Sequence, residues 1–170
     1  MIERYSRKEL KDIWSEENKY KIWLEVEIAA AEAMEKFKII PKGVSSIVKK
    51  KGKIKVKRIH DIEAKVKHDV IAFLTSITEQ AGIKARYLHQ GMTSSDVLDT
   101  SFNIQLMQSG KIILKDIDKI LIVLKRQAKK YKMTPCIGRS HGIHAEPITF
   151  GLKLASFYEE FKRNKKRLKD

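Results

Sequence analysis

The chain has 170 residues and a formal net charge of +15, with 42% apolar and 34% charged residues. This composition excludes a disordered acidic tail and is enough for one domain, or one and a half, with a core. The longest strongly apolar run, residues 120–124, is far shorter than the ~20 residues of a membrane-spanning helix. An N-terminus without an apolar signal segment and a single cysteine, Cys136, predict a cytoplasmic protein.

Half of the 36 basic residues lie in three stretches, at 49–58, 125–132 and 162–169. Such density is typical of a phosphate-binding surface, so nucleic acid is a candidate partner. The first and third stretches lack aromatic residues for base stacking. Lys also outnumbers Arg by 28 to 8, although the guanidinium group of Arg is better suited to bidentate hydrogen bonds with phosphate or guanine. A solvated or protein-covered lysine face explains the same counts. We therefore disfavour nucleic acid, while attraction of a small anionic substrate remains compatible with the charge.

The first predicted helix is short. Ser6 and Glu9 match a capping box, which predicts a helix that begins near Arg7. Arg4 and Tyr5 would then precede a helix N-terminus, where backbone N–H groups favour an anion.

Apolar residues at three- and four-residue spacing predict further helices over 16–37, 59–80 and 96–131. The last of these would be a rod of roughly 50 Å, which suggests a helical bundle or an oligomer core. Between them, residues 54–56 alternate like a short extended piece, and residues 84–95 form a loop.

A second irregular segment, 138–147, leads through Pro147 into a final helix. The sequence ends within that helix without a cap or a glycine, which predicts a fragment of a longer protein. With only 8 Gly and 3 Pro to interrupt it, the chain is predicted to be all-α.

The first loop gathers hydroxyl and acidic side chains directly before the long helix. His89 is followed by Thr93, Ser94, Ser95 and Asp96. These residues either cap the helix or bind a carboxylate through their hydroxyls and the exposed N–H groups. The two interpretations are compatible.

The second irregular segment contains His141 and His144, with Ser140 and Glu146 close in sequence. The His-x-x-His-x-Glu run resembles a metal-ligand set, but a glycine-rich loop with one distant cysteine is atypical of zinc sites. A Ser–His nucleophile is a second hypothesis, although no G-x-S-x-G elbow is present. Acid–base chemistry by histidine near neutral pH is the third and preferred one. We expect no metal and no cofactor.

Three blocks in fixed order carry a resemblance to a known family. They are MIERYS (1–6), KHDVIAF (67–73) with HQGMTSSDVLDT (89–100), and GRSHGIHAEPITFG (138–151). Together they resemble the adenylosuccinate lyase family of the fumarase/aspartase superfamily over the whole chain. SHGIHAEP discriminates best, since fumarase and argininosuccinate lyase usually carry a Thr/Ser-His-Leu-Gln type of sequence there.

The resemblance implies an N-terminal helical domain (1–93) followed by the first long helices of a central bundle (94–170). It implies β-elimination of fumarate from adenylosuccinate, which gives AMP, and from the succinyl-carboxamide ribotide of purine biosynthesis. His141 matches the general acid that protonates the departing nitrogen. The resemblance also implies substrate-binding residues: Arg4 and Tyr5 for the nucleotide phosphate, Lys67, His68 and Asp69 for the nucleotide portion, and Thr93 and Ser94 for the succinyl carboxylates. Supporting roles fall to His89, Ser95, Ser140, His144 and Glu146.

Two residues depart from the family pattern, because Lys67 stands where Arg is common and Ser140 where Thr is common. The family's catalytic base, a Ser on a mobile loop, has no candidate here and is expected beyond residue 170, so the chain alone should be inactive. Family members are homotetramers whose sites combine three subunits, which implies a homo-oligomer. The alternative is a non-catalytic basic helical module that binds nucleic acid or nucleotides.

Overall fold

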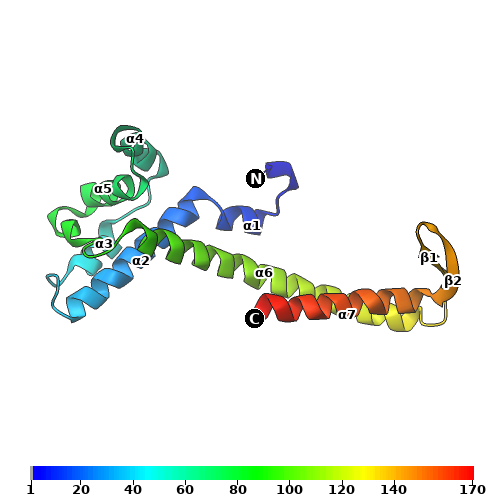
Figure 1. The fold of residues 1–170 in the computed structure, drawn as a ribbon. Coiled ribbons are helices and arrows are strands. Elements are labelled where there is room, and N and C mark those ends of the chain that lie inside the picture. Colours follow the sequence, from blue (N-terminus) through cyan, green and yellow to red (C-terminus); the bar gives the residue numbers. More distant parts are fainter. Residues whose placement is uncertain (1) are drawn as a thin grey trace. The chain divides into compact units, whose positions relative to one another are not determined.

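The computed structural model describes residues 2–170, and Met1, the first residue of the MIERYS block, lies outside the described residues. Contacts divide the chain into two units, one reaching to Gln108 and one running from Ser109 to Asp170. Seven α-helices and one two-stranded sheet make up the described part (Figure 1). The all-α prediction is therefore confirmed, with one hairpin added. The division predicted between residues 93 and 94 stays a prediction.

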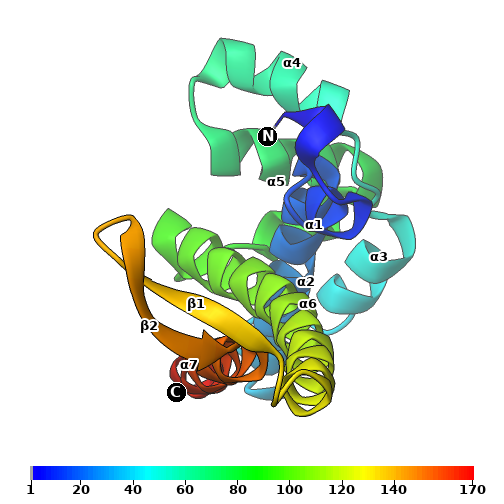
Figure 2. The ribbon, with the colours of Figure 1, turned by 90° about the vertical axis from the view of Figure 1, so that its right-hand side faces the viewer.

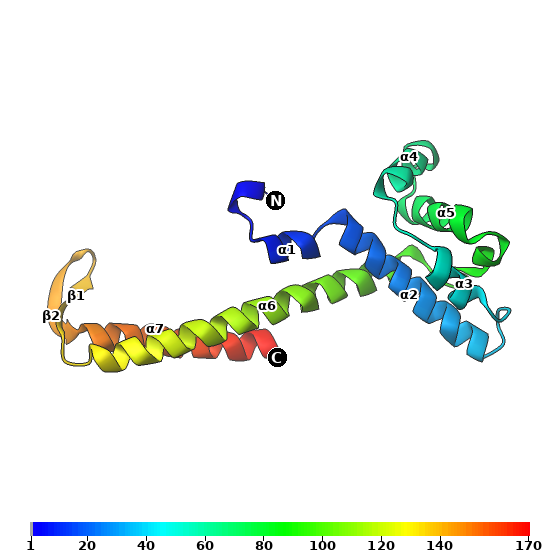
Figure 3. The same ribbon diagram turned by 180° about the vertical axis from the view of Figure 1, so that it is seen from behind.

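The first unit is built from short helices and the start of one long helix. Its elements are η1 (Glu3–Tyr5), α1 (Lys8–Ile13), α2 (Glu16–Lys36), α3 (Val44–Lys51), α4 (Val56–Val66), α5 (Asp69–Ala81), η2 (Ile83–Tyr87) and the first part of α6 (Ser94–Lys130). Helix α4 packs against α5, and α3 packs against both α2 and α5 (Figure 3). The predictions for α2 and for the long helix α6 are confirmed.

Three aromatic rings form the centre of the first unit's core. The Trp23 ring meets Tyr20 and Phe73 edge-on, at centroid distances of 5.2 and 5.5 Å, and Tyr20 stacks on Phe73 at 6.0 Å. All three side chains are buried, and burial raises the pKa of the Tyr20 phenol to about 12. Edge-on and offset pairs of this kind add to the hydrophobic gain of burial. The cluster joins α2 to α5 and so fixes where the segment before the long helix lies.

The capping box predicted for the first helix is wrong. Helix α1 begins at Lys8, Arg7 occupies the N-cap without a side-chain cap, and the Ser6 hydroxyl donates to the Ile2 carbonyl at 2.7 Å. Arg4 and Tyr5 belong to the separate turn η1. Helix α1 is only six residues long, so its N-terminus is too weak a feature to predict an anion-binding site.

The helix predicted over 59–80 is also wrong, because two helices occupy that range. Lys67 adopts a left-handed conformation with φ of 56° and ends α4, and His68 is the N-cap of α5. Apolar spacing did not reveal this break because the stripe continues in phase on both sides of it. The extended piece predicted at 54–56 is only partly right, because Ile54 and Lys55 lie outside the helices but Val56 already begins α4.

Helix α3 was not predicted, and its start depends on a carboxylate that is distant in sequence. Glu35 accepts hydrogen bonds from the backbone N–H groups of Ser45 at 2.6 Å and Gly43 at 3.2 Å. Gly43, the N-cap, has a φ of 92°, a conformation that glycine adopts without strain. Because the cap comes from Glu35 of another helix, no pattern of neighbouring residues in the sequence predicts it.

The second unit consists of the rest of α6, the strands β1 (Pro135–Ser140) and β2 (Ile143–Thr149), and α7 (Phe150–Lys169). Helix α7 runs back along this part of α6 (Figure 1): the Gly151 N–H donates to the Tyr131 carbonyl at 2.9 Å, and Lys165 pairs with Asp118. The two strands lie side by side (Figure 2). A Cβ at Gly151 would lie 2.5 Å from the Ala128 carbonyl oxygen, so only glycine permits this approach.

The hairpin corrects the prediction of an irregular segment at 138–147. The strands are antiparallel, pair Ser140 with Ile143, and shift register between Ile137 and Arg139. This register shift marks a β-bulge, in which one strand has an extra residue. A bulge bends the strand and interrupts the alternation of its side chains between the two faces. A bulged, solvent-exposed hairpin lacks the apolar/polar period that reveals a strand from sequence.

Burial is confined almost entirely to the first unit. All the buried apolar residues of the described chain precede Ser109, and within 109–170 only Ser109 and Gly151 are buried. Large apolar side chains on the second unit are instead exposed, among them Ile113, Ile120, Ile122, Val123, Leu152 and Phe157. None of the helices described is both long and apolar enough to cross a membrane.

We predict that Phe73→Ala lowers the free energy of unfolding of the first unit by about 3–5 kcal/mol, because it removes the ring that packs against both Tyr20 and Trp23. Urea unfolding followed by tryptophan fluorescence measures this. Phe37→Ala is the control, since Phe37 is 72% exposed and should change stability by no more than about 0.5 kcal/mol. Equal effects of the two substitutions would contradict the assignment of the core.

The Glu35 carboxylate gives a second prediction. Its hydrogen bond from the Ser45 N–H, with a smaller contribution from Gly43, lowers the pKa of Glu35 below the ordinary 4.5. Because the folded pKa is the lower one, the stabilisation is present above the unfolded pKa and is lost as the pH falls through the folded pKa. Urea midpoints of the wild type and Glu35→Gln should differ at about pH 7 and converge as the pH falls through the folded pKa of Glu35. Glu17→Gln, at an exposed position of α2, should show no such convergence.

Candidate functional site

The KHD block forms the junction between α4 and α5. The N–H of Ile71 approaches His68 Nδ1 at 3.4 Å, and Asp69 Oδ1 lies 3.5 Å from the same nitrogen. The first contact needs a bare Nδ1 and the second a protonated one, so they belong to alternative states of the imidazole. Lys67 and His68 are exposed and Asp69 is half-buried. The break in the helix thus brings all three side chains to one exposed corner.

The hydroxyl cluster lies at the N-terminus of α6. The Thr93 N–H donates to Asp96 Oδ2 at 2.8 Å, which is the acidic half of a capping box. This satisfies one helix-terminal donor and agrees with the capping interpretation of the sequence. Within residues 2–170, no hydrogen bond occupies the hydroxyls of Thr93 or Ser94, and Ser95 is exposed. The cap therefore leaves these hydroxyls available for a ligand.

His89 precedes this cluster and is held by a buried carboxylate that the sequence analysis missed. Glu27 Oε1 lies 2.6 Å from His89 Nδ1, and Glu27 Oε2 accepts the His89 backbone N–H at 2.8 Å. Glu27 is 1% exposed. The available signal was its position in the apolar stripe of α2, between Leu24 and Ile28, where an acidic residue is buried only with partners.

Arg4 and Tyr5 sit apart from these groups. The Arg4 guanidinium lies over the Tyr5 ring at 4.8 Å from its centroid, and both side chains are exposed. In the described part of the chain no hydrogen bond or ion pair joins them to the 67–69 junction or to the 89–96 loop. The chain by itself thus holds three separate groups of candidate residues in its first unit.

His141 lies at the turn of the β1–β2 hairpin. His141 and Gly142 are the two loop residues, with φ of 52° and 80°. Two successive positive φ values define a type I′ turn, which normally takes Asn-Gly or Gly-Gly. Ser140, His144 and Glu146 are exposed on the strands. Across residues 2–170, no three His, Cys, Asp or Glu side chains gather as a metal site.

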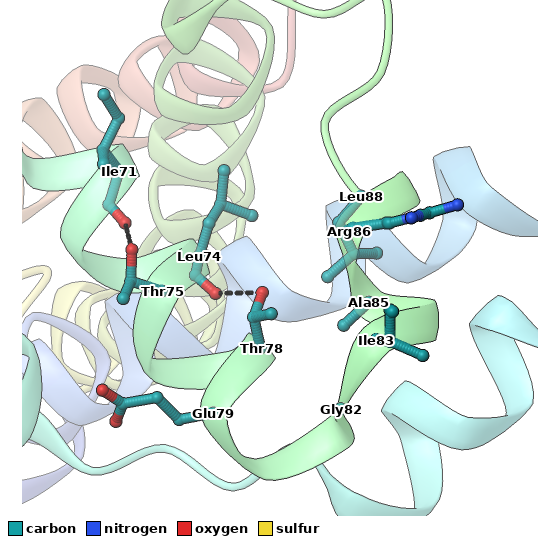
Figure 4. Close-up of a pocket in the computed structure, with 10 residues that line it drawn as sticks. All are labelled: Ile71, Leu74, Thr75, Thr78, Glu79, Gly82, Ile83, Ala85, Arg86 and Leu88. Carbon is teal, nitrogen blue, oxygen red and sulfur yellow. Dashed lines mark hydrogen bonds between the residues drawn. The ribbon is translucent and has the colours of Figure 1, made fainter.

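A groove of about 480 Å³ lies between α5 and η2 (Figure 4). Most of its lining is aliphatic, and the hydroxyls of Thr75 and Thr78 donate to the Ile71 and Leu74 carbonyls. Its acidic residue, Glu79, is paired with Arg58 at 2.9 Å. Arg86, the basic residue of the wall, donates to the Tyr87 hydroxyl at 2.9 Å. With these polar groups paired and no candidate residue in its wall, the groove is not the candidate site.

Comparisons with known proteins identify the family of the chain. A sequence profile of a family described as lyase matches residues 3–170. The chain therefore belongs to this lyase family.

More particularly, it is similar to two adenylosuccinate lyases. It is 48% identical over 168 residues to that of Thermotoga maritima and 45% identical over 169 residues to that of Bacillus subtilis, with 99% of this chain covered in both cases. The chain spans 39% of the length of each relative. The resemblance found from the three sequence blocks is confirmed.

Solved structures support the fold. A fumarate lyase from Mesorhizobium sp. BNC1 matches with a TM-score of 0.87 at 27% identity, over 94% of this chain and 38% of that one. A β-carboxy-cis,cis-muconate cycloisomerase from Acinetobacter calcoaceticus also gives 0.87, at 25% identity, over 96% of this chain and 40% of that one.

The turn geometry predicts that His141→Asn keeps the hairpin and His141→Val disrupts it, because Asn tolerates positive φ and a β-branched residue does not. Backbone amide chemical shifts and cross-strand nuclear Overhauser effects between Ser140 and Ile143 would report the pairing. Intact pairing in the valine variant would contradict the turn assignment. Asn is thus the substitution that removes the imidazole while keeping the backbone.

Proposed function

We propose that this chain is the N-terminal part of an adenylosuccinate lyase that eliminates fumarate from adenylosuccinate and from the succinyl-carboxamide ribotide of purine biosynthesis. The observation that carries the proposal is the identity of 45–48% to adenylosuccinate lyases over nearly the whole chain. The exposed position of His141, the open hydroxyls of Thr93 and Ser94 and the charged 67–69 junction support it. We further propose that the protein is cytoplasmic.

In the proposed reaction a base removes a proton from the carbon next to a succinyl carboxylate. The electron pair forms the carbon–carbon double bond of fumarate as the C–N bond breaks, and the nitrogen leaves with a proton from His141. Negative charge grows on the carboxylate during this step, so hydroxyl and N–H donors at Thr93 and Ser94 would stabilise the transition state more than the ground state. Ser95 and Ser140 would support these loops.

The nucleotide part of the substrate is assigned to the remaining groups. Lys67, His68 and Asp69 would bind the nucleoside portion, and Arg4 with Tyr5 its phosphate. A single-point ammonium at Lys67 keeps the charge of the more common Arg but not its planar fork. No metal or cofactor enters this scheme.

We also propose a homotetramer, completed by the parts of the protein that this chain does not span. The exposed apolar side chains of the second unit support assembly: Ile122 is 69% exposed and Leu152 61%, and aliphatic surface of this extent is stabilised by burial against partners. The base and the rest of each site would come from those other parts and from neighbouring subunits. The chain alone is therefore expected not to turn over substrate.

The function can be tested in a chimera in which this chain replaces the matching 39% of the Bacillus subtilis relative. We expect the chimera to release fumarate from adenylosuccinate, and His141→Asn to lower kcat by at least about 100-fold through loss of the general acid. His60→Asn is the control, because His60 is an exposed histidine of α4 paired with Glu16 and outside the proposed site.

A folded, tetrameric chimera without activity would count against the proposal. Salt-dependent retention of RNA by the same chimera, unaffected by His141→Asn, would then favour the nucleic-acid alternative. Turnover by the isolated 170-residue chain would instead refute the claim that its site is incomplete.

A further inference from the structure

The Glu27–His89 pair is the most deeply buried ionisable contact described in the chain. The Glu27 side chain is 0% exposed and the His89 side chain 20%. Burial of a carboxylate is costly unless its oxygens are fully hydrogen-bonded. Here each oxygen has its own donor, one from the ring and one from the backbone of the same residue.

The two donors require a carboxylate and not merely a polar group. A glutamine at position 27 has one acceptor oxygen; with that oxygen on the His89 backbone N–H, its NH₂ group would face Nδ1 and could bond only to a bare Nδ1, which is the Nε2–H tautomer. An aspartate keeps both acceptors but is shorter by one methylene. The geometry thus distinguishes Glu from its two nearest analogues.

The same contacts fix the orientation of the imidazole. Because Nδ1 faces the carboxylate at 2.6 Å, the proton is on Nδ1, and Nε2 is the nitrogen left for another partner. In the described part of the chain Nε2 has no hydrogen-bond partner. The backbone of His89 is held in the left-handed region, with φ of 62°, and this strain is offset by the bond from its N–H to Glu27.

We propose that Glu27 is a positioning residue: it holds His89 in the Nδ1–H form with the ring fixed, so that Nε2 is the nitrogen that binds the substrate. A neutral ring would accept a hydrogen bond at Nε2, and a protonated ring would donate one to an oxyanion, while Nδ1–H stays on Glu27 in both states. The identity of the ligand rests on the proposed function, but the Glu27–His89 linkage does not.

The first test is the protonation pattern of the ring and needs no activity. In ¹⁵N-histidine-labelled chain, long-range ¹H–¹⁵N spectra distinguish the two nitrogens, and loss of a signal in His89→Asn assigns residue 89. We expect Nδ1–H in the wild type and a mixture or Nε2–H in Glu27→Gln. Glu25→Gln, which removes an exposed carboxylate from the same helix, should leave the pattern unchanged. An Nε2–H ring in the wild type overturns the proposal even if the Gln variant fails to fold.

The second test uses the active chimera. Glu27→Gln should lower kcat/KM by about 10- to 100-fold, Glu27→Asp should recover part of the loss, and Glu25→Gln should have no effect. In a chimera that already carries His89→Asn, Glu27→Gln should not lower kcat/KM further, because Glu27 acts only through the His89 ring. An additional loss of about 10-fold in the double variant, with circular dichroism unchanged, would refute the positioning role. If the chimera is inactive altogether, the proposed function fails while the spectra still decide the linkage.

Discussion

The long helix α6 has to be covered along its whole length, and the rest of the structure depends on how that is done. Along α6 the residues Val97, Ser101, Gln105 and Ser109 recur every four positions and are at most 8% exposed. On this face the Gln105 amide donates to the Ile13 carbonyl at 2.8 Å, and the Ser101 hydroxyl donates to the Val97 carbonyl at 2.6 Å. Past Ser109 the helix carries exposed aliphatic residues such as Ile113 and Ile120, and their burial against further helices would stabilise this part of α6.

Three of the candidate residues have backbones held where side chains are disfavoured. Four non-glycine residues of the described chain have positive φ, and three of them, Lys67, His89 and His141, are candidate site residues. Such conformations cost on the order of 1–3 kcal/mol each and persist only where their surroundings hold them. Helix termini, a buried carboxylate and a hairpin register provide that support here, each by a different means.

Much of the fold and several of the candidate residues could be predicted from the sequence. The features that were not predicted have a common cause. Long amphipathic segments such as 16–37 and 96–131 were found because periodicity is a local property. The break at Lys67, the cap from Glu35 to Ser45 and the pairing of Glu27 with His89 join residues whose relation appears only in three dimensions. The hairpin escaped because its turn uses His-Gly where Asn-Gly is the usual signal. Family resemblance identified His141 and His89 but gave no account of what orients them.

The left-handed histidines also bear on how such a protein changes under selection. Glycine or asparagine would relieve the backbone at position 141, whereas at position 89 either replacement would leave the buried Glu27 Oε1 without its ring donor. A library screened only for solubility or heat resistance would therefore enrich replacements at position 141 and keep the imidazole at position 89. The two histidines would separate in such a screen, and thermostable clones would lose only the one at the hairpin turn.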